Sequence, residues 1–261
     1  MMGWNSLYMF AMVSIGCWLT AAIMALANGK RQRNSVLVSV FQFTGIIVLS
    51  VFIILLTVGL QRPPLQTLGE IRLWYAFFLV IAGWITFYYW RFSWILLFTT
   101  VLSSVFLLIN IFRPEIHHQM LPPALQSFWF IPHVILYMFS YALLACTFLI
   151  ALIGLIKHKD TYLQASENLT VAGVSFFTVA MLMGSLWAKV AWGHYWTWDA
   201  KELWAALTWM MYLFYLQYKN YKKNHNKTAY WILIVAFVCL QMCWYGIYYF
   251  PSQHQSFHTY F

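Results

Sequence analysis

Long apolar runs alternate with short polar connections along almost the whole chain. Each run is close to the roughly 20 residues that an α-helix needs to cross the hydrocarbon core of a membrane. The third and fourth runs are separated only around Arg91, so they could also form one re-entrant pair. Ten-residue segments of alternating polarity, typical of membrane β-barrels, do not occur. The pattern predicts an all-α, polytopic bundle of about eight transmembrane helices, at residues 4–27, 36–60, 71–90, 93–112, 129–156, 169–191, 203–218 and 229–250.

Composition supports a membrane protein. Of the 261 residues, 63% are hydrophobic and 8% are charged, and the mean hydropathy is +0.70. A soluble domain is nearer half apolar and a quarter charged. The four cysteines form neither a CxxC nor a CxxCH motif, which excludes a thioredoxin-like redox pair and a covalent haem site on this chain. They are expected to be small apolar side chains within the predicted helices.

The basic residues indicate the orientation of the chain. The first apolar run has no basic residue before it and Lys30 to Arg33 ("KRQR") after it. A signal peptide has the reverse arrangement, so the run is expected to be a retained anchor with its N-terminus outside. Threading the chain from there places ten Lys and Arg residues on the cytoplasmic side and five outside, with both termini extracytoplasmic. The net charge of +9 is then a topology signal, and nucleic acid is not an expected partner.

The segment "WGHYWTWDAKELW", Trp192 to Trp204, falls in an outward loop in this threading. Six of the 15 tryptophans lie between Trp187 and Trp209. An interfacial aromatic belt is one interpretation, because tryptophan prefers the headgroup layer. A belt spreads its rings over every helix end, however, and a concentration around Gly193 favours a flat platform for a large planar ligand.

Two carboxylates and two histidines are the other candidate functional residues on this side. Asp199 and Glu202 are three residues apart at the predicted start of a helix, which is the spacing of an N-cap residue and its N3 partner. His133 and His258 are both expected at the outer surface, above the helix ends. A single interfacial histidine is commonly an amphipathic anchor, whereas two imidazoles on one face can bind one haem iron from opposite sides.

The Trp-rich loop resembles the "WWD" signature of the haem-handling proteins that assemble c-type cytochromes, the CcmC/CcmF/CcsA superfamily. Three other stretches resemble the CcsA (ResC) group of that superfamily, in the same order along the chain: "RPPLQTLGE", "LPPALQSFWFIPHV" and the C-terminal "HTYF". The resemblance assigns residues 61–261 to a cytochrome c assembly domain. Residues 1–60 would add N-terminal transmembrane helices to the same bundle.

This resemblance implies a set of haem-binding residues. His133 and His258 would be the axial ligands of the iron of haem b, held as a substrate or transient ligand. Cations at the outer face would contact the haem propionates, and the candidates are Arg62, Arg72 and Lys201. The porphyrin would be held by the loop residues Trp192, Gly193, Tyr195, Trp196, Trp198, Asp199 and Glu202.

The implied function is the System II route of cytochrome c biogenesis in the bacterial inner membrane, with an extracytoplasmic active face. The chain would be a subunit of a cytochrome c synthase (haem lyase) with a CcsB-type partner, and a thioredoxin-like thiol reductant is a further expected partner. It would present haem to apocytochrome c for thioether attachment at CxxCH. A CcmC-like protein that loads a haem chaperone and a b-type haem electron carrier are the alternatives.

Two positions depart from the family pattern. The family usually has proline after the loop aspartate, where this chain has Ala200. CcsA proteins commonly carry an intramembrane histidine near Leu216, where this chain has Gln217. An amide is a weak iron ligand, so a haem site at the inner side is not expected from this residue.

Overall fold

The computed structural model describes residues 3–27, 35–117, 127–157, 159–221 and 226–246. These residues form helices and short turns without a strand, which confirms the all-α expectation. The chain divides into two compact units, residues 1–121 and 122–261, and each is considered by itself. The division expected at residue 60 follows a family resemblance rather than packing, and it stays a prediction.

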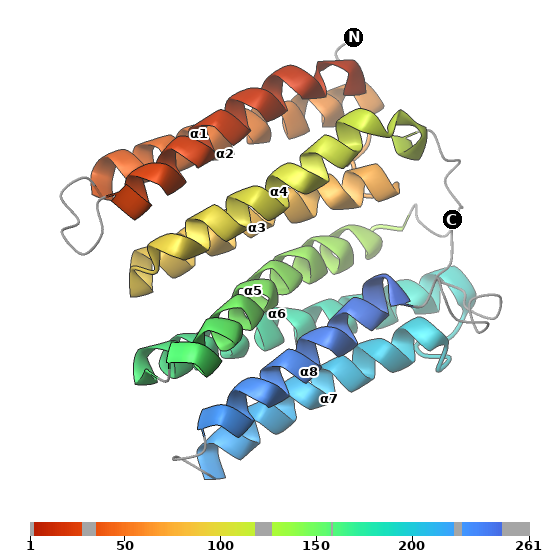
Figure 1. Cartoon of the computed structure of the whole chain (residues 1–261). Coiled ribbons are helices and arrows are strands. Elements are labelled where there is room, and N and C mark those ends of the chain that lie inside the picture. Colours follow the sequence, from red (N-terminus) through yellow and green to blue (C-terminus); the bar gives the residue numbers. More distant parts are fainter. Residues whose placement is uncertain (1–2, 28–34, 118–126, 158, 222–225, 247–261) are drawn as a thin grey trace. The chain divides into compact units, whose positions relative to one another are not determined.

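The first unit contains four long helices that lie side by side (Figure 1). Glycines let helices approach closely, as is common inside membranes. Gly45 of the second helix lies directly against the Trp18 indole of the first, and Gly83 of the third lies against Thr99 of the fourth. The elements are η1 (Trp4–Ser6), α1 (Leu7–Ala27), α2 (Ser35–Leu60), α3 (Leu68–Trp90), α4 (Ser93–Phe112) and η3 (Pro114–His117).

Helices α3 and α4 are separated by a reversal of only two residues. Arg91 takes the left-handed conformation (φ 56°, ψ 32°), and its N–H donates to the Phe87 carbonyl at 2.8 Å. Phe92 then occupies the N-cap position of α4, and its carbonyl accepts the Ile95 N–H at 3.0 Å. The two helices have 23 and 20 residues, and each is long and apolar enough to cross a membrane. The length and composition of each helix therefore favour two spanning helices over one re-entrant pair.

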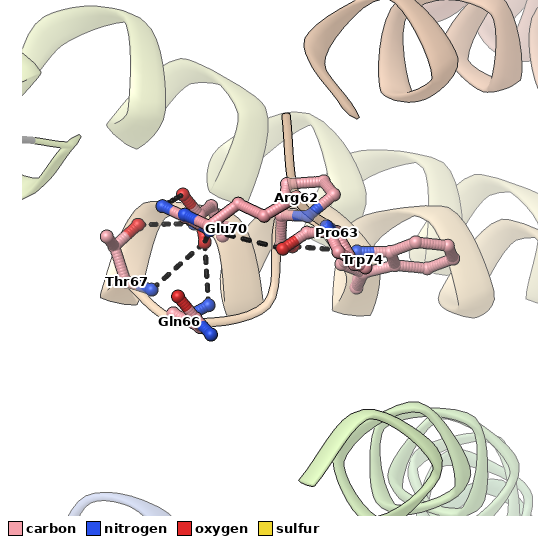
Figure 2. A network of polar contacts seen from close by, with 7 residues as sticks. Arg62, Pro63, Gln66, Thr67, Glu70 and Trp74 are labelled. Atoms are coloured by element: carbon pink, nitrogen blue, oxygen red, sulfur yellow. Dashed lines mark hydrogen bonds and ion pairs between the residues drawn. The ribbon is translucent and has the colours of Figure 1, made fainter. Parts of the chain in front are cut away.

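A polar network fixes the start of α3 (Figure 2). Thr67 and Glu70 form a capping box, in which each side chain accepts a hydrogen bond from the other residue's backbone N–H. The Arg62 guanidinium meets the buried Glu70 carboxylate through two hydrogen bonds of 2.8 and 2.9 Å. The backbone N–H of Gln66 donates to the same carboxylate at 2.6 Å. This network explains why the helix begins at Leu68, three residues before the apolar run.

The second unit also contains four helices (Figure 1). The hydroxyl of Ser140 in the first helix donates to the Gly173 carbonyl of the second at 2.7 Å, and a Cβ atom at Gly173 would meet Leu144. The indole of Trp209 in the third helix donates to Thr178 of the second at 2.8 Å. The helices are α5 (Phe130–Lys157), α6 (Asp160–Trp192), α7 (Ala200–Tyr221) and α8 (Asn226–Trp244).

Two helices of this unit differ from the simple hydropathy prediction. Helix α6 has 33 residues and begins at Asp160. It is longer than the apolar run expected at 169–191, because its first section is polar and was not counted with that run. Helix α7 has 22 residues and includes the expected 203–218, but its Tyr, Gln and Lys residues lower its hydropathy. In the part of the chain that the structure describes, seven helices are long and apolar enough to cross a membrane, and α7 is not among them.

Candidate functional site

His133 lies in the first turn of α5, on the predicted outer side. The turn is closed by the Phe130 N–H on the Ser127 carbonyl at 3.1 Å and by the His133 N–H on the Trp129 carbonyl at 3.3 Å. Pro132 is tolerated here because the first N–H groups of a helix have no intrahelical acceptor. His133 therefore belongs to the first turn of a helix and not to a loop.

The imidazole of His133 is held against α6. Its Nδ1 atom lies 2.9 Å from the carbonyl oxygen of Ala180. A Cβ atom placed at Gly184 would be 2.5 Å from ring atoms Cε1 and Nδ1, and 3.5 Å from Nε2. The ring therefore occupies the space that a side chain at Gly184 would fill, and Nε2 is farther from this position than Nδ1.

Aromatic rings surround this imidazole. The ring of Tyr137 meets it edge to face at a centroid distance of 4.8 Å, and the Trp187 ring lies at 5.5 Å. Trp187 is almost completely buried and in turn contacts Phe130 at 5.0 Å and Trp192 at 4.8 Å. His133 is thereby connected, ring by ring, to the first tryptophan of the predicted loop.

The loop between α6 and α7 begins at Gly193. This glycine ends α6 in a left-handed conformation (φ 81°, ψ −3°), which a residue with a side chain rarely adopts. The Lys189 ammonium donates to the Gly193 carbonyl at 2.8 Å and lies 5.2 Å from the ring centre of Tyr195. The expected tight turn at Gly193 is therefore present, and a cation lies beside it.

Two tryptophans of the loop have contrasting environments. Trp196 and Trp198 meet edge to face at a centroid distance of 5.8 Å. Trp198 is 69% exposed, and its backbone is left-handed (φ 59°). The indole N–H of Trp196 is buried, and within the described part of the chain it has no hydrogen-bond acceptor. The loop thus presents one apolar ring surface and one buried donor.

Asp199 and Glu202 are structural at the start of α7. The Asp199 carboxylate accepts the Glu202 N–H at 2.8 Å, which is the N-cap to N3 bond that their spacing predicts. The Glu202 carboxylate accepts the Thr197 N–H at 2.7 Å. The predicted capping role is confirmed, and the second half of the box reaches two residues farther back into the loop.

A chain of weak sulfur hydrogen bonds lies deeper in the same unit. The Tyr141 hydroxyl donates to the Cys243 sulfur of α8 at 3.6 Å, and this thiol donates to the Lys201 carbonyl of α7 at 3.6 Å. Tyr137 and Tyr141 also contact one another at a centroid distance of 5.6 Å. Three helices therefore meet below His133. All four cysteines of the chain are free thiols.

The predicted site residues are placed as follows. His133, Lys201 and the loop residues Trp192 to Glu202 belong to one end of the second unit. Arg62 and Arg72 belong to the first unit, and Arg62 has a structural partner in Glu70. His258 lies outside the described residues. The assignment of all these residues to haem stays a prediction.

Three groups around His133 were missed from the sequence. They are Gly184, the carbonyl of Ala180 and the ring of Tyr137. The spacing of four residues between His133 and Tyr137 places both on one face of a helix and could have identified the tyrosine. No local pattern marks Gly184 or Ala180, which lie 47 or more residues away from His133 in the chain.

Comparison with known proteins identifies the family. A family model described as "Cytochrome C assembly protein" matches residues 65–254 of this chain. The chain belongs to this family. The match covers Gln66, Thr67 and Glu70 of the network at the start of α3, all four helices of the second unit and the Trp-rich loop. As a cytochrome c assembly protein, the chain combines a family-matched region with N-terminal helices that lie outside the match.

Curated relatives of this cytochrome c assembly protein are named "Cytochrome c biogenesis protein CcsA". That of Chlamydomonas reinhardtii is 34% identical over 167 residues, which cover 57% of this chain and 47% of the relative. That of Guizotia abyssinica is 28% identical over 202 residues, which cover 58% of this chain and 62% of the relative. The chain is therefore similar to CcsA-type proteins, and it spans about half to three-fifths of the length of the relatives it matches.

Proposed function

We propose that this chain binds haem at the extracytoplasmic face of the membrane and presents it to apocytochrome c. The observation that carries the proposal is the fixed imidazole of His133 beside the Trp-rich loop. Family membership and the similarity to CcsA-type proteins support a role in cytochrome c assembly. The ligands, the orientation in the membrane and the partner chains belong to the proposal.

The tautomer of His133 suits an iron ligand. A backbone carbonyl can only accept a hydrogen bond, so Nδ1 must carry the proton that it shares with Ala180. The neutral ring then has its lone pair on Nε2, which is the atom farther from Gly184. Histidines that bind metals commonly donate their other ring N–H to a carbonyl in this way. The residues present therefore fit a haem group with axial imidazole ligation.

The loop would hold the macrocycle. Exposed Trp198 supplies an apolar ring surface, and the buried N–H of Trp196 supplies a donor for an anionic group. Lys189 and Lys201 are the cations of this unit closest in sequence to the loop, and they are the candidates of this unit for the haem propionates. Asp199 and Glu202 would act on haem only indirectly, since both are engaged in fixing the loop to α7.

The contribution of the protein to catalysis would be positional. His258 would supply the second axial imidazole, and one of the two histidines would give way to the histidine of the substrate CxxCH motif. Holding haem in one place turns the encounter with two substrate thiols into a local reaction, which can remove much of a barrier. In this proposal the chain is the haem-binding subunit of a synthase in the bacterial inner membrane. A CcsB-type protein and a thiol reductant would be its partners.

The ligand assignment is tested by replacing the two histidines. The purified wild-type protein is expected to have the absorption spectrum of six-coordinate haem with two imidazole ligands. His133→Ala and His258→Ala should each lose this spectrum and abolish maturation of a co-expressed cytochrome c. Added imidazole should restore part of the maturation, because it can fill the vacated coordination position.

His194→Ala is the matched control, since His194 is an exposed histidine of the same loop. It should keep both haem and maturation. The ligand assignment is wrong if both histidine variants retain full haem content and full maturation.

A further inference from the structure

We infer that Gly184 is a positioning residue that sets the orientation and tautomer of His133. The inference rests on the proposed function, in which His133 binds haem iron. It assigns a role to a residue that has no group able to contact iron. The absence of a side chain at this one position of α6 is what the site requires.

The imidazole of His133 lies in the space that the missing side chain of Gly184 leaves open. The Cε1 and Nδ1 atoms of His133 lie 2.5 Å from the Cβ position of Gly184, closer than real Cβ contacts come. Any side chain there would occupy the volume of the imidazole. Gly184 is buried in the middle of α6, with helix on both sides. A glycine in a helix interior costs about 1 kcal/mol relative to alanine, so the contact offers a reason for keeping it.

The hydrogen bond between His133 and the Ala180 carbonyl depends on the same space. Ala180 and Gly184 are four residues apart, so they lie on the same face of α6 one turn from each other. The His133 ring reaches the Ala180 carbonyl across the space left open at Gly184, at a distance of 2.9 Å. A ring pushed off this space would move away from the carbonyl. The residue at position 184 therefore determines both the space for the His133 ring and which ring nitrogen carries the proton.

The consequence concerns the iron ligand. A hydrogen bond from Nδ1–H to a carbonyl makes the imidazole a more basic ligand, and losing such a partner typically costs 10- to 100-fold in metal affinity. A more basic axial ligand stabilises ferric over ferrous iron. Displacing the ring from Ala180 should therefore weaken haem binding and raise the reduction potential of the haem that remains.

Gly184→Ala tests the inference, with Gly173→Ala as the matched control. Both glycines are buried in α6, and a Cβ atom at either would meet a side chain of α5, but at Gly173 that side chain is Leu144, whose Cδ2 atom would be 2.7 Å away. Gly184→Ala should bind haem about 10- to 100-fold more weakly than wild type and shift the reduction potential upward. Gly173→Ala should leave the affinity and the potential unchanged.

The outcomes separate this inference from the proposed function. If His133→Ala and His258→Ala both keep full haem content and full maturation, the proposed function fails. If His133→Ala loses haem while Gly184→Ala retains wild-type affinity and potential, only the role of Gly184 is overturned. Equal losses in both glycine variants would also overturn it, because they would report a general packing defect.

A measurement on the unaltered chain covers the case in which Gly184→Ala does not fold. The haem-free protein with 15N-labelled histidine is compared by NMR with His133→Gln, which identifies the His133 signals by difference. The expected result is a proton on Nδ1 and none on Nε2. A proton on Nε2 instead would overturn the inference.

Discussion

At the scale of single residues, the polar side chains near the loop are fixed mainly by backbone groups. His133 is held by the Ala180 carbonyl, Asp199 by the Glu202 amide and Glu202 by the Thr197 amide. The backbone has fewer rotatable bonds than a long side chain, so such contacts orient a side chain more firmly than contacts between two flexible side chains would. A site that works by positioning benefits from this construction.

The cap of α7 gives a prediction at this scale. Asp199→Ala removes the acceptor for the Glu202 N–H, and it should destabilise the protein by about 1 kcal/mol. Asp199→Asn keeps an oxygen at the same place and should cost no more than a few tenths of a kcal/mol, because asparagine caps as well as aspartate. The free energies can be measured by denaturant titration in mixed micelles followed by circular dichroism. A large loss with asparagine would mean that the charge matters beyond the cap.

At the scale of elements, the start of α3 depends on a buried charge with its partners. The Glu70 side chain is fully buried, and it receives the Arg62 guanidinium and the backbone N–H groups of Gln66 and Thr67 (Figure 2). Trp74 closes the preceding loop by donating from its indole to the Pro64 carbonyl at 2.9 Å. Burying a carboxylate is costly unless it is paired, so the loop and the helix should form together.

Removing the cation from this network should therefore be damaging. Arg62→Ala leaves the carboxylate of Glu70 buried without its counter-charge, and we expect a loss of roughly 3 kcal/mol in the free energy of unfolding. The same change made together with Glu70→Gln should cost clearly less, because no charge is then stranded. The four proteins of this double-mutant cycle can be compared by titration with denaturant. Equal costs in the two backgrounds would show that Arg62 and Glu70 are not coupled.

At the scale of the whole molecule, candidate chemistry gathers at one end of the second unit. His133 in the first turn of α5, the C-terminus of α6 and the N-terminus of α7 all belong to this end. The basic residues predict that it faces outward. Helix α7 then runs away from the site for 22 residues, about 33 Å at 1.5 Å per residue. That length suffices to span the hydrocarbon core.

The orientation can be tested with cysteine labelling at the two ends of α7. His194 precedes the helix and Asn220 lies in its last turn, and both are exposed. In a Cys17→Ser background, an impermeant thiol reagent should label His194→Cys in intact cells. Asn220→Cys should react only after the cells are opened. The native Cys146, Cys239 and Cys243 are buried and should react little. Labelling of Asn220→Cys alone in intact cells would reverse the predicted topology.

Much of the fold could be predicted because each helix that crosses a membrane must be apolar over about 20 residues. Apolar length located the helices, although α7 is less apolar than the other seven. A spacing of three residues located the cap formed by Asp199 and Glu202. Boundaries were less certain where polarity and helix formation diverge. The polar residues that follow Asp160 lower the hydropathy of the segment but still form a helix. A prediction from apolar length therefore placed the start of α6 too late.

The sequence by itself determined the class of the molecule, the number of helices and the family motifs, because each depends on residues that are close together in the chain. Only the tertiary structure decided which groups surround His133 and which carboxylate pairs with Arg62. It also decided that Arg91 and Phe92 alone separate two helices. The physical reason is that such contacts depend on how each helix is rotated and placed along its neighbour. A membrane helix has apolar side chains on all its faces, so its sequence hardly shows which face packs against a neighbouring helix.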